Sequence, residues 1–317
     1  MNTIQTNINR VQKRERRLMC ILAHPDDESL GFGGMLAHYA HEGVATYLIT
    51  ATRGERGWLG DPAAYPGAAA LGQRREDELR AAATILGIRE TTLLEYMDGD
   101  LDQADPVAII DLLVGHLRRV RPQVVATFDP TGVYGHPDHI AICQFTTAAI
   151  SAAANPHYMD WAGQAPHQVS KLYYRACSAA ELAIYQQVFG DLVMNIDGVE
   201  RRASGWTEWA ITTRIDAVAH WQQVRRAVAC HRSQLPTYQH FVALPPDQQR
   251  ILWGNQTFYR ALSLVNGGRE IEHDLFAGTP NEVDAEHLAS EEPVAGVFAA
   301  LPLATNHATL DQPTLTA

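Results

Sequence analysis

Lysine is almost missing from this chain of 317 residues. Only Lys13 and Lys171 occur, and arginine supplies the rest of the 25 basic residues. Neither lysine lies in a setting typical of a reactive site, which argues against Schiff-base or pyridoxal chemistry and against a phosphate-binding P-loop. Acidic residues number 36, so the formal net charge is -11. The chain lacks the basic excess that binding to nucleic acid or an anionic membrane requires, and we expect neither as a partner.

Cysteines and long apolar runs are also scarce. The four cysteines, Cys20, Cys143, Cys177 and Cys230, are scattered without a CxxC pair. We therefore expect reduced thiols rather than a disulfide framework or a thiolate metal site. No run approaches the length of a membrane-spanning helix, and no apolar signal segment follows the basic residues near the N-terminus. Together these absences predict a cytoplasmic protein.

The remaining composition, 46% hydrophobic and 19% charged, is that of a globular protein. In the first half, short apolar runs alternate with helical patterns, which predicts βαβ units and a parallel sheet. The expected strands are residues 18–23, 45–51, 92–96 and 123–128, and the expected helices are 33–42, 73–86, 107–119 and one from 136 or 137 through 151. We predict an α/β fold with a Rossmann-like, mostly parallel sheet, helices on both faces, and a smaller α+β part toward the C-terminus.

The second half of the chain is less regular. It contains an expected strand at 171–176, expected helices at 179–188, 216–231 and 247–264, and a hairpin or extended arm over 199–213. We expect residues 1–17 to be a polar leader and residues 18–276 to be one domain. Within that domain, 18–155 form the Rossmann-like core and 156–276 the substrate side. Residues 277–317 contain no lysine or arginine and predict a poorly ordered acidic tail.

Two polar segments follow expected strands. His24–Glu28 directly follows the apolar run Leu18–Ala23, and Tyr134–His139 comes soon after the fourth strand. Acidic groups at the end of a buried strand cost free energy unless something electropositive lies beside them, and a metal ion is the simplest candidate. Ligands of open parallel sheets bind at the carboxyl ends of the strands, where the two segments can meet. Together they offer histidine and aspartate ligands that suit a catalytic zinc with an open position.

The spacing within each segment favours a site over a simple turn. His24 and Asp27 are three residues apart, as are His136 and His139, so the members of each pair point the same way on a helical turn. One member of each pair can bind the metal while the other faces the substrate. Alone, either segment is typical of a capped turn, and Asp138 of a helix cap. Both segments together, at two strand ends, favour a metal site.

Three side chains of these segments suit the chemistry of hydrolysis. Asp26 can accept a proton from the attacking water, because zinc lowers the pKa of water to roughly 7. A protonated His136 can stabilise an oxyanion or protonate a leaving amine. The Tyr134 hydroxyl can add a hydrogen bond to the oxyanion.

At this point the chain resembles the PIG-L/LmbE-like family of zinc-dependent N-deacetylases. The hallmarks of that family, an A-H-P-D-D-E segment and an H-P-D-H segment, stand here as Ala23–Glu28 and His136–His139. The resemblance covers residues 18 to 276 and weakens after the fourth strand. It implies a Rossmann-like sheet and a hydrolase that removes the N-acetyl group from a small N-acetylglucosamine conjugate. The length and the loop 60–71 look most like the GlcNAc-inositol deacetylases of mycothiol synthesis.

Matching positions assign roles within this resemblance. It implies a metal bound by His24, Asp27 and His139, a general base at Asp26, and transition-state stabilisation by His136 and Tyr134. The expected ion is Zn²⁺, with another divalent ion such as Fe²⁺ as the alternative.

The resemblance also suggests residues around this centre. Arg75 is expected to contact the substrate, and Asp98 to bind sugar hydroxyls unless it only forms an Asp-Gly turn. Glu28 and Asp138 are expected behind the ligands, with Glu28 orienting a ligand histidine. Residues 230–234 also match a family segment, and we expect them to close a helix.

Other interpretations stay open. Gly31–Gly34 superficially suggests a dinucleotide-binding loop, but the acids at 26–28 lie between strand and glycines and would repel a pyrophosphate. A metal-dependent amidase or esterase acting on another small substrate would use the same ligands. A non-catalytic metal-binding protein is the third possibility, and the intact candidate base Asp26 argues against it. The sequence is also compatible with a homo-oligomer.

Overall fold

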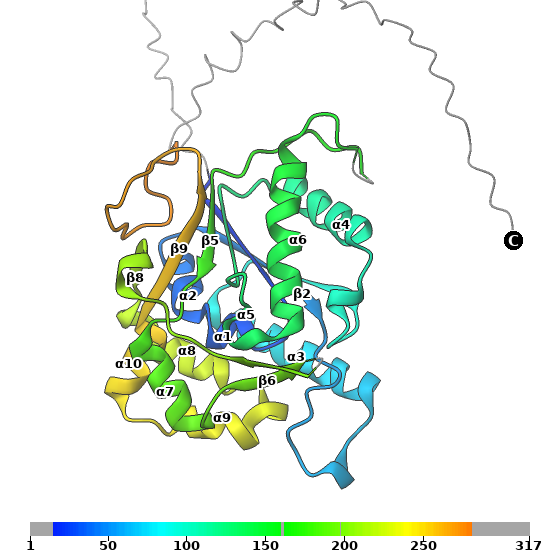
Figure 1. Cartoon of the computed structure of the whole chain (residues 1–317), viewed down its shortest axis with the longest axis vertical. Coiled ribbons are helices and arrows are strands. Elements are labelled where there is room, and N and C mark those ends of the chain that lie inside the picture. Colours follow the sequence, from blue (N-terminus) through cyan, green and yellow to red (C-terminus); the bar gives the residue numbers. More distant parts are fainter. Residues whose placement is uncertain (1–14, 160–161, 197, 281–317) are drawn as a thin grey trace, which may run out of the picture. The chain divides into compact units, whose positions relative to one another are not determined.

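The computed structural model describes residues 15–159, 162–196 and 198–280. These described residues form one compact unit (Figure 1). Most of the predicted leader, residues 1–14, and nearly all of the predicted acidic tail, residues 281–317, lie outside the described residues. Within the described ranges, no helix combines the length and the apolar character that crossing a membrane would need.

A seven-stranded mixed sheet forms the centre of this unit. Its order is β3-β2-β1-β4-β5-β9-β8. The strands are β1 (Arg17–Leu22), β2 (Ala45–Thr52), β3 (Glu90–Tyr96), β4 (Val124–Thr127), β5 (Lys171–Arg175), β8 (Thr213–Asp216) and β9 (Asn255–Ser263). The first five are parallel to one another, and β9 runs antiparallel to both β5 and β8. The predicted fold class, a mostly parallel sheet in an α/β fold, is confirmed.

The helices cover both faces of the sheet. They are α1 (Asp27–Leu30), α2 (Gly33–His41), α3 (Ala68–Leu86), α4 (Pro106–Val120), α5 (Gly132–Gly135), α6 (Pro137–Ala154), α7 (Ala179–Phe189), α8 (Trp221–Val228), α9 (Leu235–Val242) and α10 (Pro246–Gly254). Right-handed crossovers place α2 and α3, which lead out to β2 and β3, on one face. They place α4, which leads from β3 back past β1 to β4, and α6, which leads from β4 to β5, on the other face. Accordingly α4 contacts α6, while α2 and α3 contact α8.

The strand order reverses between β1 and β4. The chain builds β1, β2 and β3 in one direction and then returns to place β4 on the free side of β1. Five of the six β1 residues are buried, as expected for a parallel strand with helices on both faces. A crevice for ligands forms at such a reversal, beyond the carboxyl ends of the two strands. Both polar segments found in the sequence begin there.

The predicted helix over residues 247–264 is wrong in its second half. Helix α10 ends at Gly254, and Asn255–Ser263 is the strand β9. This run includes Thr257, Phe258 and Tyr259, which are β-branched or aromatic and favour a strand. Pairing with β5 and β8, both distant in sequence, decides its conformation. The apolar pattern of a short run does not distinguish the two structures by itself.

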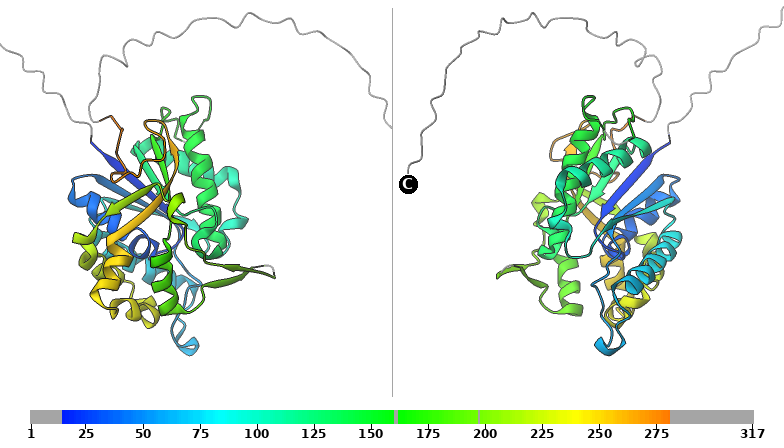
Figure 2. Two further views of the ribbon diagram at one scale, coloured as in Figure 1. Left: turned by 60° about the vertical axis from the view of Figure 1, so that its left-hand side comes forward. Right: turned by 90° about the vertical axis from the view of Figure 1, so that its right-hand side faces the viewer.

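Smaller differences concern element boundaries. Helix α3 begins at Ala68, five residues before the predicted start, because Ala68–Ala70 are strong helix formers after Gly67. The predicted arm over 199–213 is two structures, the end of a hairpin and the separate strand β8. The hairpin pairs β6 (Val193–Ile196) with β7 (Val199–Arg202), and Figure 2 shows it extending away from the central sheet.

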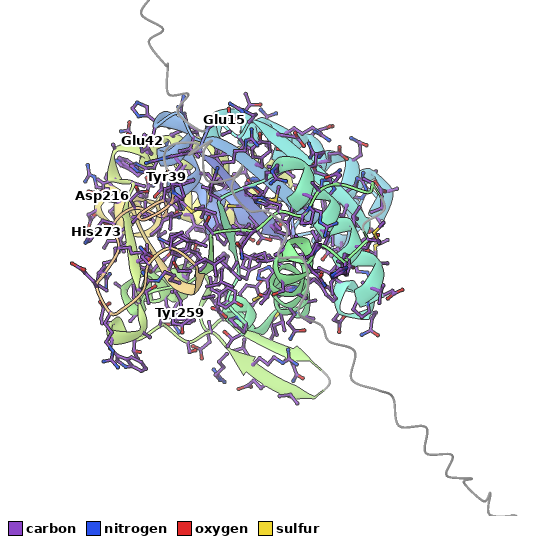
Figure 3. The ribbon with its side chains drawn as sticks, turned by 90° about the horizontal axis from the view of Figure 1, so that it is seen from above. Glu15, Tyr39, Glu42, Asp216, Tyr259 and His273 are labelled. Carbon is purple, nitrogen blue, oxygen red and sulfur yellow. The ribbon has the colours of Figure 1, made fainter. Side chains whose placement is uncertain are left out.

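The segment after β9 packs back on the sheet. Lys171 is fully buried, with Nζ 2.5 Å from Glu272 Oε1, and Tyr173 donates its hydroxyl to Glu272 Oε2 at 2.7 Å. Tyr39 of α2, which is labelled in Figure 3, donates its hydroxyl to Asp274 Oδ1 at 3.0 Å. These polar contacts therefore fix the segment after β9 near the amino end of β5. The two polar segments lie at the opposite edge of the sheet, at the carboxyl ends of the strands.

Candidate active site

The two polar segments meet at the carboxyl ends of β1 and β4. After β1, the chain passes Asp26, whose φ of 115° is unusual for a residue other than glycine, and enters α1. After β4, it passes Val133, with a φ of 66°, before α6 begins at Pro137. Strained backbone of this kind persists only where the surroundings enforce it, and it gathers at functional sites.

His24, Asp27 and His139 form a triangle, which we call the metal triangle. His24 Nδ1 lies 3.2 Å from His139 Nε2 and 3.6 Å from Asp27 Oδ2, and His139 Nε2 lies 3.4 Å from Asp27 Oδ1. Tetrahedral ligands about 2.0–2.2 Å from a zinc ion are separated by about 3.4 Å. All three side chains are buried. Two imidazoles and one carboxylate are therefore spaced to hold a divalent metal ion.

His24 also belongs to two further sets of three residues whose possible ligand atoms lie within 4.8 Å of one another. The first set is His24, His136 and His139, and the second is His24, Asp98 and Asp138. The second group faces the opposite ring nitrogen, since His24 Nε2 lies 3.1 Å from Asp138 Oδ2 and 3.2 Å from Asp98 Oδ1. Carboxylates in that position typically orient a metal-binding histidine. Asp98 and Asp138 thus lie behind His24 and present Nδ1 toward the triangle.

Backbone hydrogen bonds hold these two carboxylates in place. Asp138 accepts from Gly99 N at 2.7 Å and Leu101 N at 3.1 Å, and Asp98 accepts from Arg56 N at 3.0 Å. Burial disfavours the charged form of Asp98, but the hydrogen bond and charge of His24 outweigh it and lower the pKa of Asp98 to about 2. The predicted Asp-Gly turn at residue 98 is present. Its Asp98 side chain faces His24, and its Gly99 N–H holds Asp138.

Asp27 and His136 differ in their electrostatic surroundings. Burial alone would raise the pKa of Asp27, but the charge of His139 and the hydrogen bonds of both histidines lower it well below its usual range. Burial and the charge of His24 lower the pKa of His136 to about 3. His136 Nδ1 accepts a hydrogen bond from Asp138 N at 3.2 Å, as the cap of α6. A neutral His136 therefore carries its hydrogen on Nε2.

Asp26 lies beside the triangle and holds two buried donors. Its Oδ2 accepts from Arg75 Nη2 and from the Tyr238 hydroxyl, both at 2.8 Å. Burial raises the pKa of Asp26, and the charge of Arg75 offsets only part of this rise. Arg75 is 4% exposed and also donates to Pro25 O and Gly54 O. The structure therefore places Arg75 behind Asp26, whereas the sequence analysis expected Arg75 to contact the substrate.

Glu28 is fully buried and binds no histidine of the metal triangle. It accepts from Asp26 N at 2.9 Å and pairs with His231 Nε2 at 2.8 Å. The expectation that Glu28 orients a ligand histidine is wrong, because its partner comes from residues 230–234. Residues 230–234 follow the end of α8, as expected, and through His231 they also contact Glu28.

Tyr134 lies beside His136 and His139. Its ring centroid is 5.5 Å from that of His139 and 5.9 Å from that of His136. Burial raises the pKa of Tyr134 above its ordinary value, so the phenol keeps its proton and stays a hydrogen-bond donor. The structure thus brings every predicted site residue into one region.

Sequence reasoning missed two residues, Tyr238 and His231. Tyr238 lies in α9, a helix that the sequence pattern did not indicate, 212 residues from Asp26. No local signal connects two positions so far apart. A lone histidine in Cys230-His231-Arg232 was visible, but its partner Glu28 was not.

Comparison with known proteins agrees with this geometry. Residues 19–150 match the family described as PIG-L, GlcNAc-PI de-N-acetylase. A 1D-myo-inositol 2-acetamido-2-deoxy-alpha-D-glucopyranoside deacetylase of Streptomyces griseus subsp. griseus is 33% identical over an alignment 307 positions long, gaps included, and this alignment covers 89% of this chain and 94% of that protein.

Two solved structures have a similar fold. A conserved protein of Thermus thermophilus has a TM-score of 0.56 at 25% identity, over 79% of this chain and 96% of its own. An N,N'-diacetylchitobiose deacetylase from Pyrococcus horikoshii has a TM-score of 0.58 at 20% identity, over 77% of this chain and 83% of its own. The two polar segments, the sheet that joins them and these similarities lead to one conclusion: the chain belongs to the PIG-L family of de-N-acetylases.

Proposed function

We propose that this protein is a metal-dependent hydrolase that removes the N-acetyl group from an N-acetylglucosamine-type conjugate. The metal triangle, with Asp26 beside it at the reversal of strand order, is the observation that carries this proposal. In the reaction, water adds to the amide carbonyl carbon and the C–N bond breaks. The products are a carboxylic acid and an amine, which at neutral pH become a carboxylate and an ammonium group when the acid gives its proton to the amine.

The residues favour zinc as the ion. Two imidazole nitrogens and one carboxylate form the ligand set of several catalytic zinc sites, and Fe²⁺ is the alternative for the same donors. When bound, such an ion polarises the carbonyl group and activates water. His24, Asp27 and His139 would hold it, while Asp98 and Asp138 fix the orientation of His24.

The other residues bind, orient and move protons. Asp26 accepts a proton from the attacking water and returns it to the leaving nitrogen, which balances the reaction. Arg75 and Tyr238 hold its carboxylate in position. The Nε2–H of a neutral His136 and the hydroxyl of Tyr134 donate to the oxyanion that forms at the carbonyl oxygen.

The substrate that we propose is a small amino-sugar conjugate in the cytoplasm. A glucosamine–inositol conjugate is the first candidate, because the relative from Streptomyces griseus subsp. griseus carries that activity in its name and aligns over 94% of its length. We propose no nucleic-acid or membrane partner, and self-association is compatible with the proposal.

The test is acetate release by the purified full-length protein, with bound metal measured in the same samples. N-acetylglucosaminyl inositol, methyl N-acetylglucosaminide and free N-acetylglucosamine are the substrates. Asp26→Asn should lower kcat roughly 10²- to 10⁴-fold and keep the metal. Asp102→Asn, at an exposed carboxylate, is the matched control and should leave kcat unchanged. Full activity of Asp26→Asn would refute the general-base role, and activity without bound metal would refute the hydrolase proposed here.

A further inference from the structure

We infer that the surface of the domain carries a second metal site, in which His38, His41 and His220 bind a divalent transition-metal ion. His38 and His41 lie on α2, and His220 ends the short 3₁₀ turn Val218–His220 that directly precedes α8. This turn contacts α2. None of the three side chains takes part in the proposed hydrolysis, so the inference goes beyond that function and does not depend on it.

The histidine cluster lies away from the metal triangle. Helix α2 starts at Gly33, soon after the carboxyl end of β1, and leads back to the start of β2 at Ala45. Its last turn therefore lies toward the amino edge of the sheet, whereas the triangle lies at the carboxyl edge. Glu42, which is labelled in Figure 3, follows this last turn. An ion bound by the cluster is thus a different ion from the one in the proposed active site.

The ring separations in the cluster match those of two ligands of one ion. The ring centroid of His220 lies 5.3 Å from that of His41 and 5.9 Å from that of His38. In the metal triangle, the ring centroids of His24 and His139 lie 5.2 Å apart. Two imidazoles bound tetrahedrally to one ion at about 2.0–2.1 Å place their centroids about 5 Å apart. His220 therefore lies at a ligand-like distance from each histidine of α2.

The two histidines of α2 can complete the site by rotation of their side chains. They are three residues apart and so share one face of the helix. Ligand pairs with this spacing occur on the helices of di-metal bundles. His41 is exposed and His38 is half-buried, and in the ranges that the structure describes no hydrogen bond or ion pair restrains either ring. Binding an ion therefore requires only that these two rings turn toward His220.

The surroundings of His220 favour its role as a ligand. Burial and the charges of the two histidines of α2 lower the pKa of His220, and the hydrogen bond with Gln223 and the charge of Glu42 offset only part of this fall. A neutral imidazole is the form that binds a metal ion. Gln223 donates through Nε2 to Ile85 O at 2.7 Å, which leaves Oε1 as an acceptor for the N–H of His220. Such a partner behind the ring is typical of a metal-binding histidine.

The ligand set favours copper. Three imidazoles without a thiolate suit Cu²⁺, Ni²⁺ and Zn²⁺, and Cu²⁺ binds most tightly of the three. The negative charge of Glu42 beside the cluster favours any cation there. The partly exposed rings lose rotamer freedom on binding, so we expect a lower affinity for zinc than at the buried triangle. Cu²⁺ is therefore the probe that separates the cluster from the zinc-loaded triangle.

The first test is titration of the zinc-loaded full-length protein, without an affinity tag, with Cu²⁺. We expect saturation at one Cu²⁺ per chain, no release of zinc, and an electron paramagnetic resonance spectrum with nitrogen couplings from imidazole ligands. Binding that does not saturate at one ion per chain would mean an adventitious ion only and would overturn the inference. Release of one zinc ion for each Cu²⁺ bound would assign the copper to the metal triangle and contradict it.

Variants assign the copper to this cluster. His41→Ala and His220→Ala should each weaken Cu²⁺ binding more than roughly 100-fold, because losing a ligand costs more than losing a partner behind one. His240→Ala, at an exposed position of α9, is the matched control and should bind Cu²⁺ like the wild type. If His220→Ala fails to fold, the exposed His41 still gives a decisive variant. Equal affinity of His41→Ala and His240→Ala would overturn the inference.

The same variant separates this site from the proposed active site. His41→Ala should keep one bound zinc ion and the wild-type kcat for acetate release while it loses Cu²⁺ binding. Loss of zinc or of activity together with copper would place the ion in the metal triangle and contradict the second site. If the wild-type protein hydrolyses no N-acetyl sugar, the proposed function is wrong, and the copper titration still decides whether the cluster binds a metal ion.

Discussion

Single hydrogen bonds decide the geometry of the proposed base. Asp26 stands at a positive φ, its backbone N–H donates to Glu28, and its carboxylate accepts from Arg75 and Tyr238. The strain of this backbone position, of order 1–3 kcal/mol, persists because buried partners fix both ends of the residue. The side chain is therefore held in position before a substrate arrives.

Tyr238→Phe removes one of these bonds and keeps the ring. We expect a loss of about 1–2 kcal/mol, hence a fall in kcat of roughly 5- to 30-fold with little change in KM or bound metal. Tyr174→Phe on β5 is the matched control, because it also removes one tyrosine hydroxyl. That hydroxyl pairs with Thr147 of α6 at 2.9 Å. Steady-state kinetics and metal analysis check both. An equal effect of the two substitutions would mean that Tyr238 acts only on stability.

Asp138→Asn tests the orientation of His24. The amide cannot match all three interactions that Asp138 makes with His24, Gly99 and Leu101. Loss of a partner behind a ligand typically weakens metal binding about 10- to 100-fold. Competition with a chelator measures this affinity, with Asp102→Asn as control. Unchanged affinity in a folded Asp138→Asn protein would remove Asp138 from the metal centre.

At the scale of elements, the first half was predictable because its signals are local. Apolar runs, the Asp105-Pro106 start of α4 and Gly87 after α3 each mark an element within a few residues. The candidate ligands follow from such strands, because β1 and β4 must end at one edge. Strand β9 escaped prediction because its partners lie far away in sequence, and α9 escaped with it. The positions of Arg75, Glu28 and Tyr238 depend on these distant contacts.

The contact between β5 and the segment after β9 gives a stability prediction. Glu272→Gln deprives the buried Lys171 of its carboxylate partner and should cost about 3 kcal/mol. Lys171→Met combined with Glu272→Gln should recover much of the loss, because an apolar group replaces the buried charge. Urea unfolding at neutral pH measures both variants. If the double variant is no more stable than the single one, the ion pair is not the cause.

The same carboxylate predicts sensitivity to acid. Burial would raise the pKa of Glu272, but hydrogen bonds from Lys171, Tyr173 and Asn266 lower it below its ordinary value. A carboxyl group with a lower pKa in the folded state contributes stability above its unfolded pKa, and this is lost as the pH falls through the folded pKa. The free energy of unfolding of the wild type should therefore fall more steeply below about pH 4.5 than that of Glu272→Gln. Parallel pH curves would contradict the assignment.

At the scale of the whole molecule, metal and fold should be coupled. A ligand that binds only the folded state adds about 4 kcal/mol when its concentration is a thousand times Kd. For a domain of this size, that corresponds to a rise in Tm of roughly 8 °C. Chelation should lower both Tm and activity, and added Zn²⁺ should restore them. The His24→Ala protein should show no such shift, and an equal shift in that variant would place the ion elsewhere.

The pairing of Glu28 with His231 has a consequence for how the signature of this family is understood. The family match ends at residue 150, and it contains every proposed metal ligand. Yet a fragment ending there would carry Glu28 as a buried acid without its imidazole, and Asp26 without the phenol of Tyr238. Two acidic residues of the first motif therefore depend on partners that lie outside the matched residues. The C-terminal half supplies these partners, His231 and Tyr238. A substitution there can therefore change the surroundings of Glu28 and Asp26 while both sequence motifs stay intact.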